Sequence, residues 1–529
     1  MKVPLVVTDF IDRARNLYGD ADAVSCGGER LTYGRLAERI DRASAAFTKL
    51  GVVRGDVVAF VSFNCHRLLE GYFAVPQMGA ILLPINIRLT PGDIAYILAD
   101  AGATTAVVDR ALLGLIAPVA ERLPKLRTIV LMGGDPRIPT ALGGEDYESM
   151  LASAPATFER PELDEDDVAE LFYTSGTTAR PKGVMLTNRS LYLHAMGAVV
   201  GLGCDDRIVQ LHSIPLFHVN GWGTPHSVTM VGGRHVMLPR FDSCQVLETI
   251  ERERVTDMFV VPTMALALLA DPSCATRDLS SLRRVMVGGA ASPSSLVRAL
   301  DERLPGCEVT CGYGLSETSP VLTIATLRRG VDASDDGRRD KRMTAGLPIP
   351  GVRVEIMGES ATLLPHNGAS RGEIVARGNS VMAGYWGQAE ATREVMIDGW
   401  FHTGDIGTID AEGYLRIVDR KKDIIITGGE NVSSIEIEKA VFEHPAVAEC
   451  AVIAAPDDQW GEVPMAIVVL KPGMELDEAA LIAHCRSLLA GFKVPHRVAI
   501  ADGPLPKGGT GKLLKRELRE QYLKPSTGG

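Results

Sequence analysis

Tyr173-Thr-Ser-Gly-Thr-Thr-Ala-Arg-Pro-Lys-Gly183 is the stretch of this chain that decides its fold. Small residues let backbone N–H groups approach phosphate oxygens, and the hydroxyl groups add further donors. Lys182 contributes a mobile positive charge. The apolar run from Val168 to Phe172 predicts a strand, so the stretch that follows it should be a loop at the carboxyl end of that strand. The candidate triphosphate ligands are Thr174, Ser175, Gly176, Thr177, Thr178 and Lys182.

The loop differs from a Walker A motif, which ends in Gly-Lys-Ser/Thr, because Pro181 precedes Lys182 and Gly183 follows it. A flexible Ser/Thr/Gly linker would have a similar composition, so composition alone leaves that alternative open. The full string, however, resembles the phosphate loop of the adenylate-forming superfamily. That superfamily comprises acyl-CoA synthetases, aryl-CoA ligases, peptide-synthetase adenylation domains and beetle luciferases.

Composition fits a large globular enzyme. The 529 residues exceed what one hydrophobic core supports, so two or more domains are expected. The net charge of −11 and the pI near 5.6 argue against a broad nucleic-acid-binding face. Nine cysteines without a C-x-x-C pair indicate neither a disulfide framework nor a zinc site, and a cytoplasmic location fits best. We expect no signal peptide and no integral membrane segment.

Strand-like and helical runs alternate along the chain, which predicts an α/β fold with mostly parallel strands. The strand-like runs include Asp56 to Ser62, Thr105 to Val108, Arg207 to His212, Arg234 to Met237, Asp257 to Val261 and Arg284 to Val287, and the helical runs include Tyr33 to Leu50 and Leu68 to Gly79. Arg328 to Arg342 predicts a solvated, mobile loop. Val352 to Ile417 predicts a β subdomain. We place a boundary at Asp419-Arg-Lys-Lys-Asp423, between a large N-terminal domain of residues 1–420 and a small, mobile C-terminal α+β domain of residues 421–529.

A second motif, Cys311-Gly-Tyr-Gly-Leu-Ser-Glu-Thr-Ser-Pro320, sets a carboxylate four residues after an aromatic ring. Tyr313 could stack on adenine, and Glu317 could ligate the Mg²⁺ that bridges triphosphate oxygens. Taken alone, the motif also fits an ordinary loop. The resemblance implies that Ser316, usually threonine in the family, touches the α-phosphate, and that Thr174 is a second metal contact. Further expected nucleotide contacts are Gly289, Ala290, Cys311 and Gly312.

Two further motifs complete the expected nucleotide site. In Trp400-Phe-His-Thr-Gly-Asp405, a carboxylate after a Gly turn can accept hydrogen bonds from a ribose diol, and the resemblance pairs Asp405 with Arg420. In Leu505-Pro-Lys-Gly-Gly-Thr-Gly-Lys512, the resemblance implies that Lys512 reaches the other domain during adenylation. A flexible ammonium suits negative charge that builds up only in the transition state.

The resemblance also implies a rotation between the domains, with Lys422 as the hinge. One arrangement would bring Lys512 to the site, and the other would bring the turn Thr427-Gly-Gly-Glu-Asn431, with Gly428, Gly429 and Glu430 as CoA-binding candidates. Ile426 occupies a position where many relatives have a lysine, so no lysine for the second step is carried over.

Pro215-Leu-Phe-His-Val-Asn-Gly-Trp222 matches the segment that lines the acyl pocket in the family. The segment has no aspartate to pair with an amine, so the pocket should favour an apolar acid. His218, Val219 and Trp222 are the acyl-binding candidates, with Gly289, Ala290 and Gly312 as expected walls. A lone histidine is often a structural core residue, but the resemblance makes His218 a candidate catalytic residue beside Lys512.

The sequence is most similar to fatty-acyl and 3-methylmercaptopropionyl-CoA ligases, from about Asp9 to Glu520. This similarity implies ATP-dependent formation of an acyl-AMP and transfer to CoA, with Mg²⁺ as cofactor and CoA as co-substrate. The alternatives are an aryl-CoA ligase, an acyl-AMP ligase that loads a carrier protein, a luciferase-like monooxygenase and a non-catalytic nucleotide-binding protein. The expected partners are a carboxylic acid, ATP and CoA, without nucleic acid, and a homodimer is left open.

Overall fold

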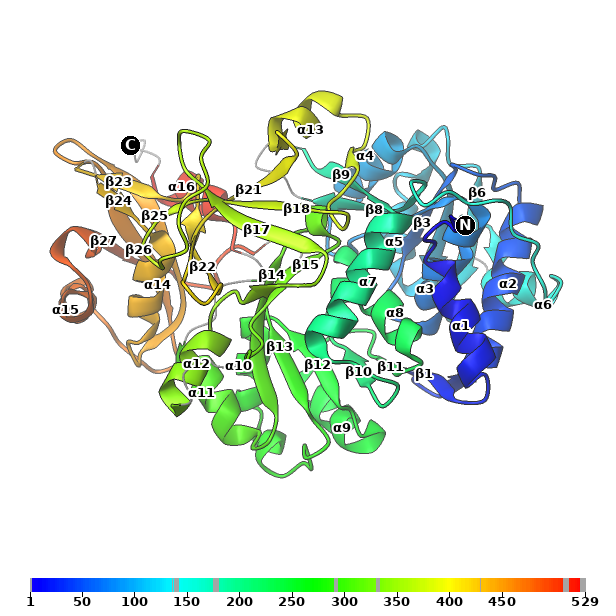
Figure 1. Cartoon of the computed structure of the whole chain (residues 1–529), viewed down its shortest axis with the longest axis horizontal. Coiled ribbons are helices and arrows are strands. Elements are labelled where there is room, and N and C mark those ends of the chain that lie inside the picture. Colours follow the sequence, from blue (N-terminus) through cyan, green and yellow to red (C-terminus); the bar gives the residue numbers. More distant parts are fainter. Residues whose placement is uncertain are drawn as a thin grey trace.

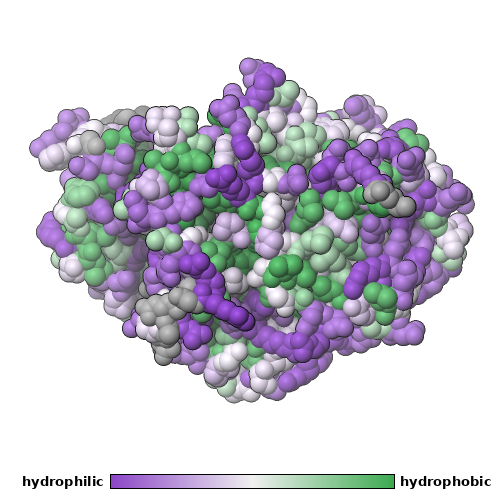
Figure 2. Space-filling view, in the orientation of Figure 1, coloured by the Kyte–Doolittle hydropathy of each residue, from purple (hydrophilic) through white to green (hydrophobic). Residues whose placement is uncertain are grey.

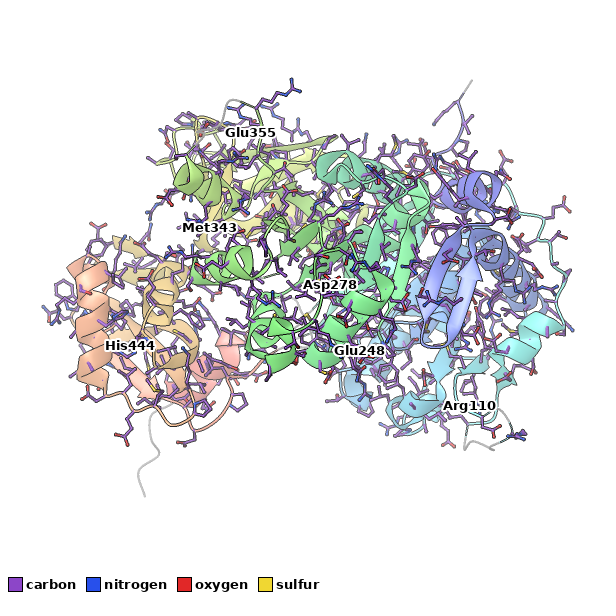
Figure 3. The ribbon with its side chains drawn as sticks, turned by 90° about the horizontal axis from the view of Figure 1, so that it is seen from below. Arg110, Glu248, Asp278, Met343, Glu355 and His444 are labelled. Atoms are coloured by element: carbon purple, nitrogen blue, oxygen red, sulfur yellow. The ribbon has the colours of Figure 1, made fainter. Side chains whose placement is uncertain are left out.

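The computed structural model describes residues 2–135, 137, 142–174, 180–289, 294–329, 334–428, 430–507 and 513–523. Within these ranges the strands form four sheets. The first residues of the chain and its C-terminal unit, described from residue 421 to 523, lie at opposite ends of the molecule (Figure 1). The same separation is visible from below, where Arg110 and His444 mark the two ends (Figure 3).

The first sheet has eight strands in the order β19-β9-β8-β4-β3-β5-β6-β7. β3 is buried along its whole length, as expected for a continuous apolar run in a parallel sheet covered on both faces. The strands are β3 (Val57–Val61), β4 (Ile81–Pro84), β5 (Ala103–Asp109), β6 (Thr128–Met132), β7 (Glu145–Asp146), β8 (Val168–Thr174), β9 (Lys182–Thr187) and β19 (Gly384–Tyr385). The helices that follow these strands or precede them are α2 (Tyr33–Lys49), α3 (His66–Ala74), η1 (Pro76–Met78), α4 (Pro91–Ala101), η2 (Arg110–Leu112), α5 (Leu113–Ile116), η3 (Ala120–Arg122) and α6 (Tyr147–Ala152).

The second sheet has nine strands in the order β16-β15-β14-β13-β12-β10-β11-β1-β2, parallel from β1 to β14 and antiparallel at both edges. Its strands are β1 (Asp22–Cys26), β2 (Glu29–Thr32), β10 (Val209–His212), β11 (Arg234–Met237), β12 (Asp257–Val260), β13 (Arg284–Val287), β14 (Glu308–Gly314), β15 (Val321–Ile324) and β16 (Leu347–Pro348). The accompanying helices are α1 (Thr8–Tyr18), α7 (Asn188–Leu202), α8 (Val219–Val231), α9 (Ser243–Glu253), α10 (Pro262–Ala270), η4 (Pro272–Ala275), α11 (Ser294–Arg303), η5 (Ser316–Thr318) and α12 (Asp335–Arg342).

Two smaller sheets follow, and the chain passes from one to the other just after Arg420. The third sheet contains β17 (Val352–Met357), β18 (Gly372–Gly378), β20 (Met396–Ile397), β21 (Trp400–Ile409) and β22 (Leu415–Arg420), with α13 (Ala389–Val395) beside it. The fourth contains β23 (Ile425–Thr427), β24 (Glu430–Val432), β25 (Val447–Asp457), β26 (Gly461–Leu470) and β27 (Arg497–Ile500), with α14 (Ser434–Phe442), α15 (Glu478–Leu488), η6 (Gly491–Lys493) and α16 (Lys515–Tyr522). The predicted α/β class, with a β subdomain and a small C-terminal unit, is therefore confirmed.

The prediction of a solvated loop from Arg328 to Arg342 is wrong for its second half, where α12 forms. Ser334 caps this helix by accepting a hydrogen bond from the Gly337 N–H group. Ion pairs then hold the helix against α11 and the β21–β22 turn, with Arg342 on Asp301 at 2.8 Å and Lys341 on Asp410 at 2.7 Å. A charge-rich run can thus form a helix when acidic partners from distant segments neutralise it.

No helix in the described part of the chain is long and apolar enough to cross a bilayer. On the face shown in Figure 2, apolar residues occur as separate patches among hydrophilic ones. The large apolar side chains are instead gathered in the cores on and between the sheets.

Candidate functional site

The β8–β9 hairpin carries the candidate phosphate loop. Thr174 is the last residue of β8 and Lys182 the first of β9, and the two residues face each other in the antiparallel ladder. The predicted ligands Ser175, Gly176, Thr177 and Thr178 lie outside the described residues. The ladder therefore fixes both ends of the loop and leaves the Thr174 hydroxyl and the Lys182 ammonium group on neighbouring strands.

Tyr385 joins Lys182 to Glu317, the candidate metal ligand. The Lys182 Nζ atom lies 5.0 Å from the centre of the Tyr385 ring, and the Tyr385 hydroxyl donates a 2.9 Å hydrogen bond to Glu317 Oε1. Tyr385 is placed by β19, which pairs with β9. Burial raises the pKa of the Glu317 carboxyl group, and the Tyr385 hydrogen bond opposes that shift. The arrangement brings a hard oxygen ligand and a cation to one end of the loop.

A second constellation lies where β14 meets β21 and β22. The Tyr313 hydroxyl donates a 2.6 Å hydrogen bond to Asp405 Oδ2, and Arg420 Nε lies 3.4 Å from Asp405 Oδ1. Asp405 and Arg420 are partners in the β21–β22 register, so the ladder itself holds this pair together. Burial, followed by the Asp405 charge, raises the pKa of Tyr313, which stays protonated as a donor. The structure thus brings Tyr313 against Asp405, which lies 92 residues later in the sequence.

The predicted acyl segment forms a left-handed turn at the start of α8. The φ angles of Asn220, Gly221, Trp222 and Gly223 are 41°, 54°, 67° and 87°. The left-handed conformation is unfavourable for residues with a Cβ atom, so neighbouring contacts must hold the turn. His218 precedes it as the N-cap residue of α8 and is partly buried.

The turn directs Trp222 toward the end of β13. The indole ring stacks on Phe259 with ring centroids 5.8 Å apart. A Cβ atom at Gly288 would lie 2.9 Å from Trp222 Cη2, and one at Gly289 would lie 3.5 Å from Cζ2. Gly312 and the buried Cys311 lie on β14, beside β13, whereas Ala290 is outside the described residues. Trp222 therefore belongs to a buried apolar cluster that also contains Ile214, Phe259, Met286, Val321, Ile324 and Ile349.

The remaining candidates belong to the C-terminal unit, and of these Gly428 and Glu430 are exposed. Gly428 has a φ angle of 57° and donates a 2.9 Å hydrogen bond from its N–H group to the Trp460 carbonyl group. Glu430 is exposed at the start of β24, and Gly429 lies outside the described residues. An isolated bridge between Lys507 and Leu513 brings together the two ends of the segment that contains Lys512, which is itself not described.

The junction between the last two sheets is tied down by several contacts. The Lys421 N–H group donates to the Gly404 carbonyl group at 2.9 Å, and the Ser433 hydroxyl donates to the Val418 carbonyl group at 2.6 Å. Arg519 donates to Asp423 Oδ1 at 2.7 Å. Lys422, by contrast, is exposed between these contacts.

Sequence reasoning missed Tyr385 and Glu170, which the structure places among the candidates. Glu170 interrupts the apolar run of β8, and an isolated carboxylate in a buried strand is a readable signal because burial requires partners for it. The sequence around Tyr385 is less informative, because a Gly-Tyr pair after a loop also fits an ordinary turn.

Models of two known protein families match the chain. Residues 11–386 match the family described as AMP-binding enzyme, and residues 436–512 match the AMP-binding enzyme C-terminal domain. The chain is 39% identical to a long-chain-fatty-acid–CoA ligase from Thermus thermophilus, over 99% of this chain and 96% of that protein. It is 36% identical to a 3-methylmercaptopropionyl-CoA ligase from Ruegeria pomeroyi, over 100% and 99%. A solved anthranilate CoA ligase in complex with anthranoyl-AMP superposes with a TM-score of 0.88, 27% identity and 99% coverage of both chains.

Proposed function

The chain belongs to the AMP-binding enzyme family, and we propose that it uses ATP to join an apolar carboxylic acid to CoA. The acid first attacks the α-phosphorus of ATP and gives acyl-AMP and pyrophosphate. The CoA thiol then attacks the acyl carbonyl carbon, loses its proton, and releases AMP as the thioester forms. The preferred acid is of the fatty-acyl kind, and an aryl acid is the alternative.

In the first step, the residues position the reactants and neutralise charge. The loop after Thr174 and the Lys182 ammonium group hold the triphosphate, while Tyr313 stacks on adenine and Asp405, supported by Arg420, accepts hydrogen bonds from the ribose. Ser316 donates to the α-phosphate. Lys512 comes from the small domain and stabilises the negative charge that develops on the α-phosphate.

The oxygen donors present fit Mg²⁺, which prefers carboxylate and hydroxyl ligands. Glu317 and Thr174 would hold the ion, and the raised pKa of Glu317 reflects a carboxylate kept in a low-dielectric position where a cation would stabilise it. When bound, Mg²⁺ neutralises charge on the triphosphate and on the departing pyrophosphate.

In the second step, rotation of residues 421–529 about Lys422 presents Gly428, Gly429 and Glu430 to the site. This turn then lies beside the pantetheine arm of CoA and orients it. His218, at the start of the acyl segment, borders the path along which the thiol approaches.

The observation that carries the proposal is the meeting of three groups around one region. Tyr313, Asp405 and Arg420 contact one another, and so do Lys182, Tyr385 and Glu317. Trp222 lies against Gly288 and Gly289 at the end of β13. An acid against Trp222 and a nucleotide against Tyr313 would share the space beside Gly288 and Gly289.

The test is incubation of the purified protein with ATP, Mg²⁺, CoA and a panel of straight-chain, branched and aromatic acids. AMP, pyrophosphate and thioester are measured separately. Thioester formation with at least one acid, in a 1:1 ratio to AMP, is the expected result.

Other outcomes identify the rival functions. Acyl-AMP that accumulates in the presence of CoA would indicate a ligase that loads a carrier protein. Light emission or oxygen uptake would indicate a luciferase-like monooxygenase, and ATP binding without pyrophosphate release would indicate a non-catalytic protein. Each of these results contradicts the proposed thioester chemistry.

A further inference from the structure

Glu170 lies in the centre of a buried hydrogen-bond network between two parts of the candidate site. Its side chain has no exposed surface, and it sits on β8 four residues before Thr174. One carboxylate oxygen, Oε2, accepts a 2.9 Å hydrogen bond from the Asn220 side-chain amide. The other, Oε1, lies 2.6 Å from His226 Nε2. Both partners belong to α8, so the carboxylate joins the phosphate strand to the acyl segment.

His226 donates to Glu170 rather than accepting from it. Its Nδ1 atom is buried and has no hydrogen-bond partner, while its ring is surrounded by the aromatic rings of Phe10, Tyr72 and Phe73. An unpaired ring lone pair costs less in such surroundings than an unpaired N–H group, so the proton belongs on Nε2. Glu170 thus accepts two hydrogen bonds from α8, one on each oxygen.

Asn220 connects Glu170 to the left-handed turn. Its amide nitrogen donates to Glu170, and its amide oxygen accepts a 2.6 Å hydrogen bond from the Gly223 N–H group. That second bond closes the turn around Trp222. Asparagine tolerates a positive φ angle better than most residues, which suits it to this position.

Other contacts fix the chain just before the turn, but none of those contacts reaches Trp222. Asn64 binds the Leu216 N–H group through its side-chain oxygen at 2.8 Å, and the Tyr72 hydroxyl donates to the Leu216 carbonyl group at 2.6 Å. The orientation of the indole therefore depends on the turn, which Asn220 closes together with a 3.0 Å hydrogen bond from the Thr224 hydroxyl to the Gly221 carbonyl group. Because the indole rests on Gly288 and Gly289, a small rotation of the turn would move the indole relative to the end of β13.

We propose that Glu170 is a positioning residue for acid selection: it holds Asn220, and through Asn220 the turn that places Trp222 against Gly288 and Gly289. Glu170 itself touches no substrate. This inference rests on the proposed function, because it assigns the Trp222 wall to the acid.

The test compares acid selectivity among variants that break the network at different points. Selectivity is the ratio of kcat/KM values for the preferred acid and for an acid longer by several methylene groups, and KM for ATP is measured alongside. Asn220→Gly removes the side-chain amide but keeps a residue that adopts positive φ readily. The variant therefore loses the hydrogen bonds without gaining backbone strain. We expect it to change the selectivity by roughly tenfold, within the range set by misfitted apolar groups. KM for ATP should stay within about threefold.

Substitutions at Glu170 provide the matched comparison. Glu170→Gln keeps an acceptor for the Asn220 amide and removes the acceptor for His226. Because the proposed attachment runs through Asn220, most of the selectivity should be retained. Glu170→Ala leaves both donors without a partner and should change selectivity as Asn220→Gly does. If Glu170→Ala fails to fold, Asn220→Gly and Glu170→Gln still decide the question.

The Trp222→Ala background shows whether the network acts through the indole. In that background, Asn220→Gly should alter selectivity by less than about twofold, since residues that act as one unit give non-additive effects. Tyr147→Phe is the control, because it removes a 2.8 Å hydrogen bond from another fully buried carboxylate, Glu70, on helices without candidate site residues. It should leave selectivity unchanged.

Two results would overturn the inference in an active enzyme. One is a folded Asn220→Gly variant with the wild-type order and ratio of acids. The other is an equal change in selectivity with and without Trp222. Absence of thioester formation by the wild-type protein with every acid would instead refute the proposed function, so the two failures are distinguishable.

Discussion

At the scale of single residues, Lys512 offers the sharpest test of the two-step reaction. Its ammonium group should stabilise only the adenylation transition state, so Lys512→Ala should slow acyl-AMP formation by roughly 10²-fold or more. When synthetic acyl-AMP is supplied, the variant should form thioester at close to the normal rate. Pyrophosphate release and thioester formation, measured separately, check this. An equal loss in both half-reactions would remove Lys512 from the proposed role.

The Tyr385–Glu317 pair predicts a pH-dependent requirement for Mg²⁺. Burial raises the pKa of Glu317, and protons compete with the metal ion for the carboxylate, so the Mg²⁺ concentration for half-maximal activity should fall as pH rises. The Tyr385 hydrogen bond lowers that pKa. Tyr385→Phe should therefore raise it and shift the whole dependence toward higher pH. Mg²⁺ titrations of the wild type and the variant at several pH values measure the shift.

A control separates this effect from lost packing. Tyr147→Phe removes a 2.8 Å hydrogen bond to Glu70, a buried carboxylate that is not a candidate ligand. Its Mg²⁺ titrations should follow the wild type at every pH. A shift of equal size in both variants would mean that the Tyr385 hydroxyl does not act through Glu317.

At the scale of elements, the β23–β24 hairpin should serve the second half-reaction alone. Gly428 holds a φ angle of 57°, and a Cβ atom there would lie 2.8 Å from Trp460 Cε3. Gly428→Ala should therefore displace the turn or the indole and slow thioester formation from acyl-AMP by about tenfold or more, with adenylation unchanged. Single-turnover measurements of each half-reaction check this. Gly473→Ala, at φ 77° with open space around it, is the matched control for backbone strain.

Elements whose periodicity is local were predictable from sequence. β11 and β13 begin and end where their apolar runs do, and α2 ends within one residue of the expected point. α12 was not predictable, because its partners Asp301 and Asp410 come from distant segments. The left-handed turn of Val219–Gly223 was missed for a related reason. Its Asn220 is held by Glu170, which lies 50 residues away in the sequence, and no local pattern encodes that contact.

The candidate site was likewise predictable from the sequence only in part. Motif residues such as Tyr313, Asp405 and Arg420 were identified by resemblance, and the structure brings them within hydrogen-bonding or ion-pairing distance. Tyr385 and Glu170 depend on how β19 and α8 pack against the β8–β9 hairpin, so they became visible only in three dimensions. The prediction of the family, the fold and a ligase of the acyl-CoA synthetase type is confirmed, whereas the roles of individual residues remain proposals.

At the scale of the whole molecule, the proposed rotation predicts that Lys422 must have a free φ angle. Lys422→Pro would fix φ near −65° and favour one domain arrangement over the other. One half-reaction should then proceed at close to the normal rate while the other, and the overall turnover, fall by roughly tenfold or more. Lys422→Ala controls for loss of the charge and should retain both half-reactions. Equal rates for both half-reactions in the proline variant would argue against a pivot at this residue.

Only residues 421–424 connect the last strand of the third sheet to the first strand of the fourth. Such a short tether keeps the C-terminal unit beside the nucleotide region at an effective concentration on the order of millimolar, far above that of a free protein in solution. A chain cut at this point would convert an intramolecular encounter into a bimolecular one. Its turnover should then depend on the concentration of the separated C-terminal fragment, and mixing experiments with the two fragments would measure directly how much of the rate the tether supplies.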